Sequence, residues 1–124
     1  MTSPITVLLV DDHAVVRKGV RGYLETQPDL QVIGEASSGE EAVTLAQDVI
    51  PDVIVMDLLM PGMDGVEATA RIHRITPNTR IIVLTSFHDD THIFPAIKAG
   101  AFSYIHKDVA PDHLVEAIRA AARG

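Results

Sequence analysis

The sequence contains no cysteine, so the chain can form neither a disulfide framework nor a thiolate metal site. A chain without cysteine fits a reducing cytosol. No apolar run approaches the roughly 20 residues that a membrane span needs. The first four residues, Met-Thr-Ser-Pro, also lack the basic region and apolar core of a secretory signal. We therefore expect a cytoplasmic protein with no membrane segment.

The sequence also lacks any run rich in lysine or arginine. Ten basic residues stand against 17 acidic ones, which gives a formal net charge of −7. A protein that binds nucleic acid directly needs clustered cations to contact the phosphates. We therefore expect no direct nucleic-acid contact from this segment, and any DNA-binding role would belong to another part of the protein.

Hydrophobic residues make up 47% of the 124 residues, which is ample for one core in one domain. Short β-branched runs alternate with helical patterns, which is typical of βαβ units around a parallel sheet. With right-handed crossovers, five such units favour a flavodoxin-like, doubly wound α/β fold with strand order 2-1-3-4-5 and five helices. The predicted strands comprise residues 6–10, 31–36, 53–56, 80–85 and 103–106.

Local signals mark where three of the helices begin. Ser38 and Glu41 have the spacing of a capping box, which predicts that the second helix opens there. Asp64 and Glu67 have the same spacing and predict the start of the third helix. Pro111 suits the first turn of the last helix, where a missing backbone N–H costs no hydrogen bond.

The predicted fourth helix has two unusual features. Pro95 falls inside it, and an interior proline costs roughly 3 kcal/mol, so the helix is expected to begin late or to be kinked. His88 and His92 lie four residues apart near its start, a spacing that can chelate a transition metal. Because no third ligand is evident, we interpret both histidines as loop and helix-surface residues.

Polar residues stand where four of the predicted strands end, and they are Asp11, Asp12, Asp57, Thr85 and Lys107. Parallel α/β sheets bind ligands outside the carboxyl ends of their strands, so these side chains are expected to converge in one crevice. In the predicted strand order, the first two aspartates face Asp57 across the gap between strands one and three. Either Asp11 or Asp12 could instead cap the first helix.

Three carboxylates in one crevice repel one another unless a cation lies between them. Oxygen ligands indicate a hard ion, and Mg²⁺ fits best because it needs few protein ligands and keeps waters and phosphate oxygens. Asp57 is the candidate nucleophile, since a carboxylate can attack phosphorus when a metal balances the charge. Lys107 would pair with one phosphoryl oxygen and the Thr85 hydroxyl would donate to another. Taken alone, Lys107 would be interpreted as an ordinary solvated loop residue and Thr85 as an ordinary β-branched strand residue.

Four stretches carry a resemblance to a known family: Val-Leu-Leu-Val-Asp-Asp-His at 7–13, Asp-Leu-Leu-Met-Pro-Gly-Met-Asp-Gly at 57–65, Val-Leu-Thr at 83–85 and Ala-Gly-Ala-Phe-Ser-Tyr-Ile-His-Lys-Asp at 99–108. With them the chain resembles a response-regulator receiver domain of two-component signalling. Many receivers have proline after the lysine, whereas the Lys-Asp pair here resembles the NarL/FixJ-type branch. That branch usually carries a C-terminal DNA-binding effector domain, which is expected but absent from this chain, so residues 1–124 correspond to the receiver.

The resemblance implies that Asp57 accepts a phosphoryl group from a sensor histidine kinase. It also implies that Asp12 binds Mg²⁺ directly, that Asp11 acts largely through water, and that Asp57 and the backbone carbonyl of Leu59 complete the metal ligands. The chain would then be a phosphorylation-activated signalling switch that controls an effector, with transcription as the expected output. Its only chemistry would be Mg²⁺-dependent phosphorylation and dephosphorylation of itself, so we expect no other enzymatic activity.

Thr85 and Tyr104 match the switch pair of the family, in which the hydroxyl moves toward the phosphoryl group and the aromatic ring turns inward. Tyr104 is equally compatible with an ordinary aromatic residue of an edge strand. Leu59 and Phe87 occupy the two variable positions that flank the phosphorylated aspartate in receivers. Two apolar side chains there would hinder an in-line water, which predicts a long-lived phosphoryl group unless Phe87 only packs on its loop.

Two other functions compete with this interpretation. A flavodoxin-like ligand-binding module would need a glycine-rich, phosphate-binding turn after strand one, where this chain has Asp-Asp-His at 11–13. A metal-dependent phosphohydrolase with an aspartyl intermediate would place a second carboxylate two residues after the nucleophile, where this chain has Leu59. Both alternatives are disfavoured by the residues at these positions.

The first and last helices are predicted to form a homodimer interface on phosphorylation. Beside the expected core stripe at positions 16, 20, 23 and 24, Val15, Gly19 and Gly22 form a second stripe that would let another helix approach closely. The last helix is rich in alanine at positions 117 and 120–122. Alternatively, Gly19 only brings the first helix near its own sheet. The competing dimer face comprises helix four, strand five and helix five.

Overall fold

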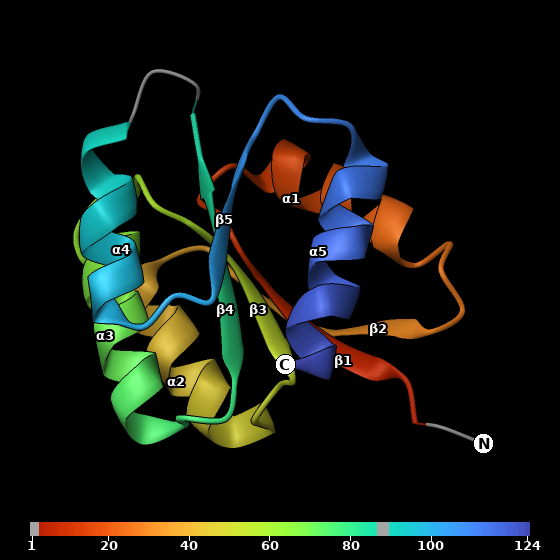
Figure 1. Cartoon of the computed structure of the whole chain (residues 1–124), viewed down its shortest axis with the longest axis horizontal. Coiled ribbons are helices and arrows are strands. Elements are labelled where there is room, and N and C mark those ends of the chain that lie inside the picture. Colours follow the sequence, from red (N-terminus) through yellow and green to blue (C-terminus); the bar gives the residue numbers. More distant parts are fainter. Residues whose placement is uncertain (1–2, 87–89) are drawn as a thin grey trace.

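The computed structural model describes residues 3–86 and 90–124, and its strands and helices alternate along the chain (Figure 1). The strands are β1 Ile5–Val10, β2 Leu30–Ala36, β3 Val53–Asp57, β4 Arg80–Thr85 and β5 Ser103–His106, each within one residue of its predicted ends. The helices are α1 Ala14–Leu24, α2 Gly39–Val49, α3 Gly65–Ile75, α4 Ile93–Ala99 and α5 Pro111–Arg123, with a 3-10 turn η1 Asp90–His92 before α4. Among the described residues, no helix combines the length and apolar character that crossing a bilayer requires.

All neighbouring strands run parallel in the order β2-β1-β3-β4-β5, which confirms the predicted flavodoxin-like, doubly wound sheet. The topological switch point lies between β1 and β3. At the carboxyl edge of the sheet, Asp57 pairs with Leu84, and Thr85 pairs with His106. Consecutive strand ends are thus held side by side, as the convergence of the predicted site residues requires.

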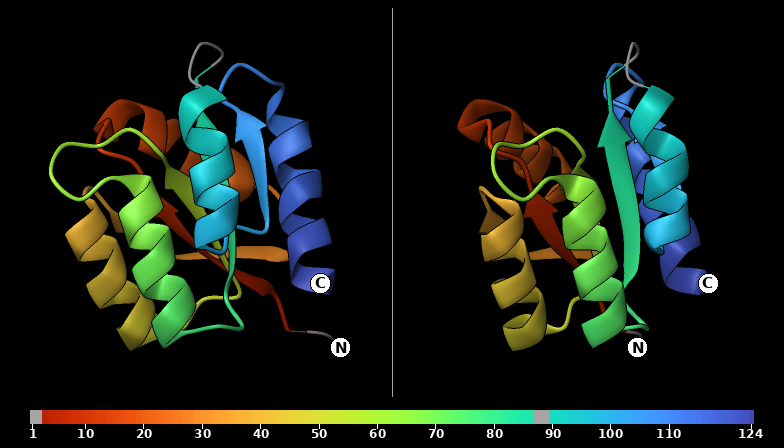
Figure 2. Two further views of the ribbon diagram at one scale, coloured as in Figure 1. Left: turned by 60° about the vertical axis from the view of Figure 1, so that its left-hand side comes forward. Right: turned by 90° about the vertical axis from the view of Figure 1, so that its left-hand side faces the viewer.

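Helices cover both faces of the sheet, with α1 and α5 on one face and α2, α3 and α4 on the other (Figure 2). One apolar cluster joins the sheet to the second group of helices through Ala42, Ile72 and Ala96. The other joins it to α1 and α5 through Leu24 and Ile118. β3 lies between both clusters and is buried along its whole length, so its sequence shows no polar alternation.

The predicted helix starts are confirmed. The Ser38 hydroxyl accepts a hydrogen bond from the Glu41 backbone N–H at 3.1 Å, and α2 begins at the next residue. The Glu41 carboxylate accepts from the Ser37 backbone N–H at 2.6 Å, one residue earlier than the predicted capping box requires. The Asp64 carboxylate accepts from the Glu67 backbone N–H at 2.9 Å before α3, and Pro111 is the first residue of α5.

α4 begins late, as its proline predicted. The 3-10 turn η1 precedes it, α4 itself has 7 residues, and Pro95 is the third of them. In this first turn the backbone N–H groups have no partner within the helix, so proline costs little there. His92 is the residue before α4, whereas His88 lies outside the described residues.

α1 buries a narrower stripe than predicted. Leu24 is fully buried and Val20 is partly buried, but Val16 and Tyr23 are 47% and 37% exposed. The prediction that all four side chains pack in the core is therefore wrong for two of them. A cavity of about 280 Å³ lies between α1 and α5, and both exposed side chains line it. Because α5 does not close over this part of α1, these side chains stay in contact with solvent.

Candidate functional site

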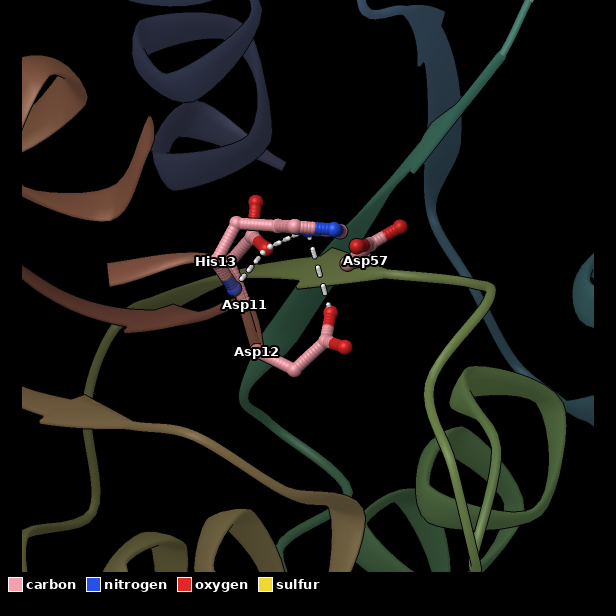
Figure 3. Close-up of side chains that lie close together, drawn as sticks. All are labelled: Asp11, Asp12, His13 and Asp57. Atoms are coloured by element: carbon pink, nitrogen blue, oxygen red, sulfur yellow. Dashed lines mark hydrogen bonds and ion pairs between the residues drawn. The ribbon is translucent and has the colours of Figure 1, made fainter. Parts of the chain in front are cut away.

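The predicted site residues gather at the carboxyl edge of the sheet. Asp11 and Asp12 directly follow β1, and Asp57 is the last residue of β3. One carboxylate oxygen from each of the three lies within 4.8 Å of the others and of a nitrogen of His13 (Figure 3). The structure therefore brings the three predicted carboxylate ligands together across the switch point between β1 and β3.

Lys107 completes the cluster from the end of β5. Its Nζ lies 2.9 Å from Oδ2 of Asp57, which is an ion pair between a buried carboxylate and a one-third exposed ammonium. The backbone N–H of Lys107 donates to the carbonyl oxygen of Thr85 at 2.8 Å, so the lysine is fixed beside the end of β4. Thr85 is itself buried, and its hydroxyl donates to the Ser86 carbonyl at 3.3 Å.

Burial dominates the electrostatics of Asp57, whose side chain is 1% exposed. Loss of solvent raises the pKa of Asp57 above the ordinary carboxyl value, and the nearby Asp11 charge raises it further. The Lys107 ammonium and the Leu59 backbone N–H act in the opposite direction and lower this pKa. The net shift is upward because the loss of solvent outweighs the stabilisation of the charged carboxylate by Lys107.

The donor set fits a hard divalent cation. Three carboxylates converge from two strand ends, and carboxylate oxygens are the ligands that Mg²⁺ prefers. Oδ1 of Asp12 is buried, and Nδ1 of His13 lies 3.2 Å from it. Burial of a carboxylate oxygen is unfavourable unless a cation or a hydrogen-bond donor compensates for the lost water, and a divalent ion between the three carboxylates would do so.

Neither Asp11 nor Asp12 caps α1. The residue before α1 is His13, and Oδ1 of Asp11 accepts the backbone N–H of His13 at 2.8 Å instead of an N–H within the helix. The alternative interpretation of these two aspartates as helix caps is therefore wrong. The turn formed by this bond directs both carboxylates toward Asp57 (Figure 3).

Sequence reasoning missed His13 as a member of the cluster. Its Nδ1 lies 3.0 Å from Oδ1 of Asp11 and 3.2 Å from Oδ1 of Asp12. Its side chain is 61% exposed, so the ring lies over the carboxylates from the solvent side. The available signal was its position immediately after the aspartate pair.

Sequence reasoning also missed Arg17, which ties the metal-ligand turn to the sheet. Its guanidinium donates to the backbone carbonyl of Asp11 at 2.5 Å and to Glu35 of β2 at 2.8 Å. Arg21, one turn later, donates to the same Glu35 at 2.6 Å. These two cations lower the pKa of Glu35, the Arg21 hydrogen bond most strongly. The network fixes α1 to the end of β1 beside the aspartates.

The predicted switch residues lie on one face of the sheet. The register pairs Tyr104 with Val83, which is two residues before Thr85, so both predicted switch side chains point toward the α4 side. Tyr104 is 47% exposed, and its ring meets that of His106 edge-on with centroids 6.0 Å apart. In this conformation the tyrosine ring therefore points outward.

Of the two residues predicted to flank the phosphorylated aspartate, the structure describes one. The Leu59 side chain is 48% exposed, and its backbone N–H donates to Oδ1 of Asp57 at 3.3 Å. Phe87 lies outside the described residues. Leu59 is thus beside the acceptor, with its apolar side chain at the solvent boundary of the site.

Comparison with known proteins identifies the family. Residues 7–119 match the family model described as the response regulator receiver domain. The chain belongs to this receiver-domain family. Transcriptional regulatory protein LiaR of Bacillus subtilis is 55% identical over 120 residues, which cover 97% of this chain and 57% of the relative. Response regulator protein VraR of Staphylococcus aureus is 47% identical with the same coverage.

The solved structures agree with the sequence relatives. The signal receiver domain of the response regulator NarL from Mycobacterium tuberculosis superposes with a TM-score of 0.93 at 30% identity and covers 99% of both chains. These likenesses support the NarL/FixJ-type branch that the Lys-Asp pair predicted. This receiver domain spans about 57% of the length of the two curated relatives.

Proposed function

We propose that this receiver domain is a phosphorylation-activated signalling switch in which Asp57 accepts a phosphoryl group from a sensor histidine kinase. The observation that carries the proposal is the buried Asp57 carboxylate, 2.9 Å from the Lys107 ammonium and within one cluster with two further aspartates. Burial leaves this carboxylate poorly hydrated, and a poorly hydrated anion is a better nucleophile. Membership of the receiver family supports the same assignment.

The proposed transfer is a substitution at phosphorus. An oxygen of Asp57 forms the new bond to phosphorus while the bond to the phosphohistidine nitrogen of the kinase breaks and that nitrogen keeps the electron pair. Mg²⁺ would be held by Asp12 and Asp57 directly, by Asp11 largely through water, and by the Leu59 carbonyl, and it supplies positive charge to the site. Lys107 then exchanges its carboxylate partner for a phosphoryl oxygen.

Thr85 has two roles in the proposal. Its hydroxyl donates to another oxygen of the phosphoryl group, and its movement toward that group leaves space into which Tyr104 turns. The shared sheet face of the two residues supports this coupling. Beryllofluoride with Mg²⁺, which mimics an aspartyl phosphate, is expected to shift amide resonances around both residues and in α4. Shifts confined to the surroundings of Asp57 would contradict the switch.

Acetyl phosphate tests the acceptor assignment without a kinase. With Mg²⁺, intact-protein mass spectrometry should detect one added phosphoryl group on the wild type and none on Asp57→Asn. Asp108→Asn is the matched control, because it removes an exposed carboxylate next to Lys107. Labelling of the Asp57 variant, or labelling that chelation of divalent cations leaves unchanged, would refute the assignment.

We further propose that the phosphoryl group is long-lived because Leu59 shields it. An apolar side chain offers an attacking water no hydrogen bond and occupies part of its path. Leu59→Asn, alone and combined with Phe87→Glu, should shorten the lifetime of the phosphoryl group. An equal or longer lifetime in both variants would show that shielding by these positions is not what limits hydrolysis.

The proposed output is transcription. LiaR is named a transcriptional regulatory protein, and this receiver domain covers 57% of it. We propose that the full-length protein is cytoplasmic and that a C-terminal DNA-binding domain, not this acidic segment, contacts DNA. The full-length protein should bind its promoter DNA more tightly after phosphorylation. Residues 1–124 alone should not retard the same DNA, and retardation by this segment would contradict the assignment.

The proposed active form is a homodimer through α1 and α5. Val15 is 85% exposed, and a Cβ built on Gly19 or Gly22 would meet no described heavy atom within 4 Å beyond its chain neighbours and the backbone of α1 itself. The alternative that Gly19 serves to bring α1 near its own sheet is therefore wrong. On α5, Ala120 and Ala122 are exposed, whereas Ala121 is buried and cannot contribute to the interface.

Sedimentation velocity with and without beryllofluoride tests the interface. Gly22→Glu should prevent dimer formation because it places a bulky charge on the proposed contact. Gln47→Glu, which adds a charge at an exposed position of α2, is the matched control and should dimerise as the wild type does. A dimer that persists in Gly22→Glu would point to the competing α4-β5-α5 face, where Phe94 and Phe102 are also exposed.

A further inference from the structure

The imidazole of His13 forms a nitrogen-containing corner of the aspartate cluster. Its Nδ1 lies between two carboxylate oxygens, 3.0 Å from that of Asp11 and 3.2 Å from that of Asp12. The close-up shows the ring above the pair and directed toward Asp57 (Figure 3). The oxygen-based metal site described above makes no use of this nitrogen.

These spacings match those between ligands of a single ion. Two ligand atoms about 2.1 Å from a metal are about 3.0 Å apart at a right angle and about 3.4 Å apart at a tetrahedral angle. The measured separations of 3.0 and 3.2 Å fall in this interval. All four ligand atoms, including that of Asp57, lie within 4.8 Å of one another, so small side-chain rotations would bring them around one ion.

The two kinds of ligand favour different metals. Mg²⁺ is a hard ion that prefers oxygen and binds imidazole weakly, whereas Zn²⁺, Ni²⁺ and Cu²⁺ bind imidazole nitrogen well. The exposed ring of His13 can present its nitrogen without unfolding any element, because it precedes α1 and is 61% exposed. An imidazole nitrogen beside two carboxylates therefore favours the transition ion over Mg²⁺.

We propose that His13, with Asp11 and Asp12, binds a divalent transition ion, with Zn²⁺ as its representative, and that this ion competes with Mg²⁺ for the acceptor site. The shared carboxylates make the two ions mutually exclusive. The proposal rests on the metal site of the proposed function but adds a ligand and a class of ion to it. Its consequence is that transition-metal supply would set how much of the protein is available for Mg²⁺-dependent phosphorylation.

Calorimetric titrations with Zn²⁺ and with Mg²⁺ test the proposal on the wild type, His13→Phe and His13→Gln. Zn²⁺ affinity should fall at least about tenfold in both variants, and this loss should exceed any loss of Mg²⁺ affinity by a similar factor. His113→Phe, which removes an exposed imidazole from α5, is the matched control and should bind Zn²⁺ as the wild type does. Added Mg²⁺ should weaken Zn²⁺ binding to the wild type.

Ring-nitrogen NMR supplies an independent signature, because Zn²⁺ should shift Nδ1 of His13 and leave the ring of His113 unchanged. Three results would overturn the proposal: unchanged Zn²⁺ affinity in the His13 variants, equal losses of Zn²⁺ and Mg²⁺ affinity, or Zn²⁺ binding that Mg²⁺ does not weaken. None of these titrations involves phosphoryl transfer, so their outcome is independent of the acetyl phosphate experiment on Asp57.

Discussion

Gly65 offers a sharp test of how the fold positions the acceptor. It is the buried first residue of α3 and donates its backbone N–H to the carbonyl of Leu58 at 2.9 Å. A Cβ built on it would lie 2.5 Å from the carbonyl oxygen of Asp57 and 2.7 Å from Cα of Leu58. Both contacts are with backbone, so no side-chain rotation can relieve them. Gly65→Ala must therefore displace α3 from the end of β3.

The expected magnitude follows from two opposing effects. Replacing glycine by alanine in a helix usually gains up to about 1 kcal/mol, and less at the first helical residue. Overpacking in a dense core usually costs about 1–3 kcal/mol, and the immovable backbone here places Gly65→Ala toward the upper end. We expect a net loss of about 2 kcal/mol in the free energy of unfolding and a Tm lower by roughly 6–10 °C.

Urea and thermal unfolding measure this change, and Gly22→Ala is the matched control. A Cβ on Gly22, which is in the interior of α1, would meet no described heavy atom within 4 Å beyond its chain neighbours and the backbone of α1 itself. The control should gain about 0.5–1 kcal/mol, since only the helix preference of alanine acts. Gly65→Ala should also weaken Mg²⁺ binding, because the displaced backbone carries Asp57. A Gly65→Ala protein as stable as the wild type would refute the argument from close backbone approach.

Three further predictions concern charge. Asp57→Asn should raise the free energy of unfolding at neutral pH with chelator present, because burial first, and then Asp11, raise the pKa of Asp57. The ionised Asp57 destabilises the folded wild type, and this effect is absent below the ordinary carboxyl pKa and develops as pH rises through the folded pKa. Urea unfolding at pH 4 and pH 7 should therefore show a difference in the free energy of unfolding between the wild type and Asp57→Asn only at pH 7. Glu35→Gln should cost about 1 kcal/mol at neutral pH and less in acid. The hydrogen bonds from Arg21 and Arg17 lower the pKa of Glu35, so the stabilisation that they provide is lost as pH falls through that pKa. If Glu35→Gln lowered the free energy of unfolding equally at neutral and at acid pH, this argument would be wrong. Mg²⁺ at 100 times its Kd should stabilise the wild type by about 2.7 kcal/mol in chemical unfolding, and Asp12→Asn should show a much smaller gain at the same concentration.

The fold was predictable because its signals are local and repeated. The β-branched runs, the caps at Ser38 and Asp64 and the proline that opens α5 each act over a few residues, and the structure bears them out. The order of the strands follows from a general handedness rule. The gathering of the site residues then follows because parallel strands end at one edge.

Side-chain direction was less predictable, since it depends on how elements pack against one another. Val16 and Tyr23 fit the core periodicity of α1, yet they line an open cavity because α5 does not cover them. His13 and Arg17 reach the aspartates only because α1 starts where it does and turns back toward β1 and β2. No pattern in the sequence encodes that docking, so Arg17 did not stand out as part of the site, whereas His13 could have been recognised from its position directly after the aspartate pair.

Lys107 connects the chemistry of the site to its proposed output. In this conformation its ammonium pairs with Asp57, while its backbone N–H bonds the carbonyl of Thr85. In the proposed mechanism a phosphoryl group on Asp57 would lie between the carboxylate and the ammonium, so Lys107 would retreat to pair with a phosphoryl oxygen. Because the same residue is hydrogen-bonded to the end of β4 and directly follows β5, its retreat would also displace the segment that carries Tyr104. We propose that a change of charge at one buried carboxylate reaches β5 in this way, through the ion pair of Lys107 with Asp57 and the chain that joins Lys107 to Tyr104.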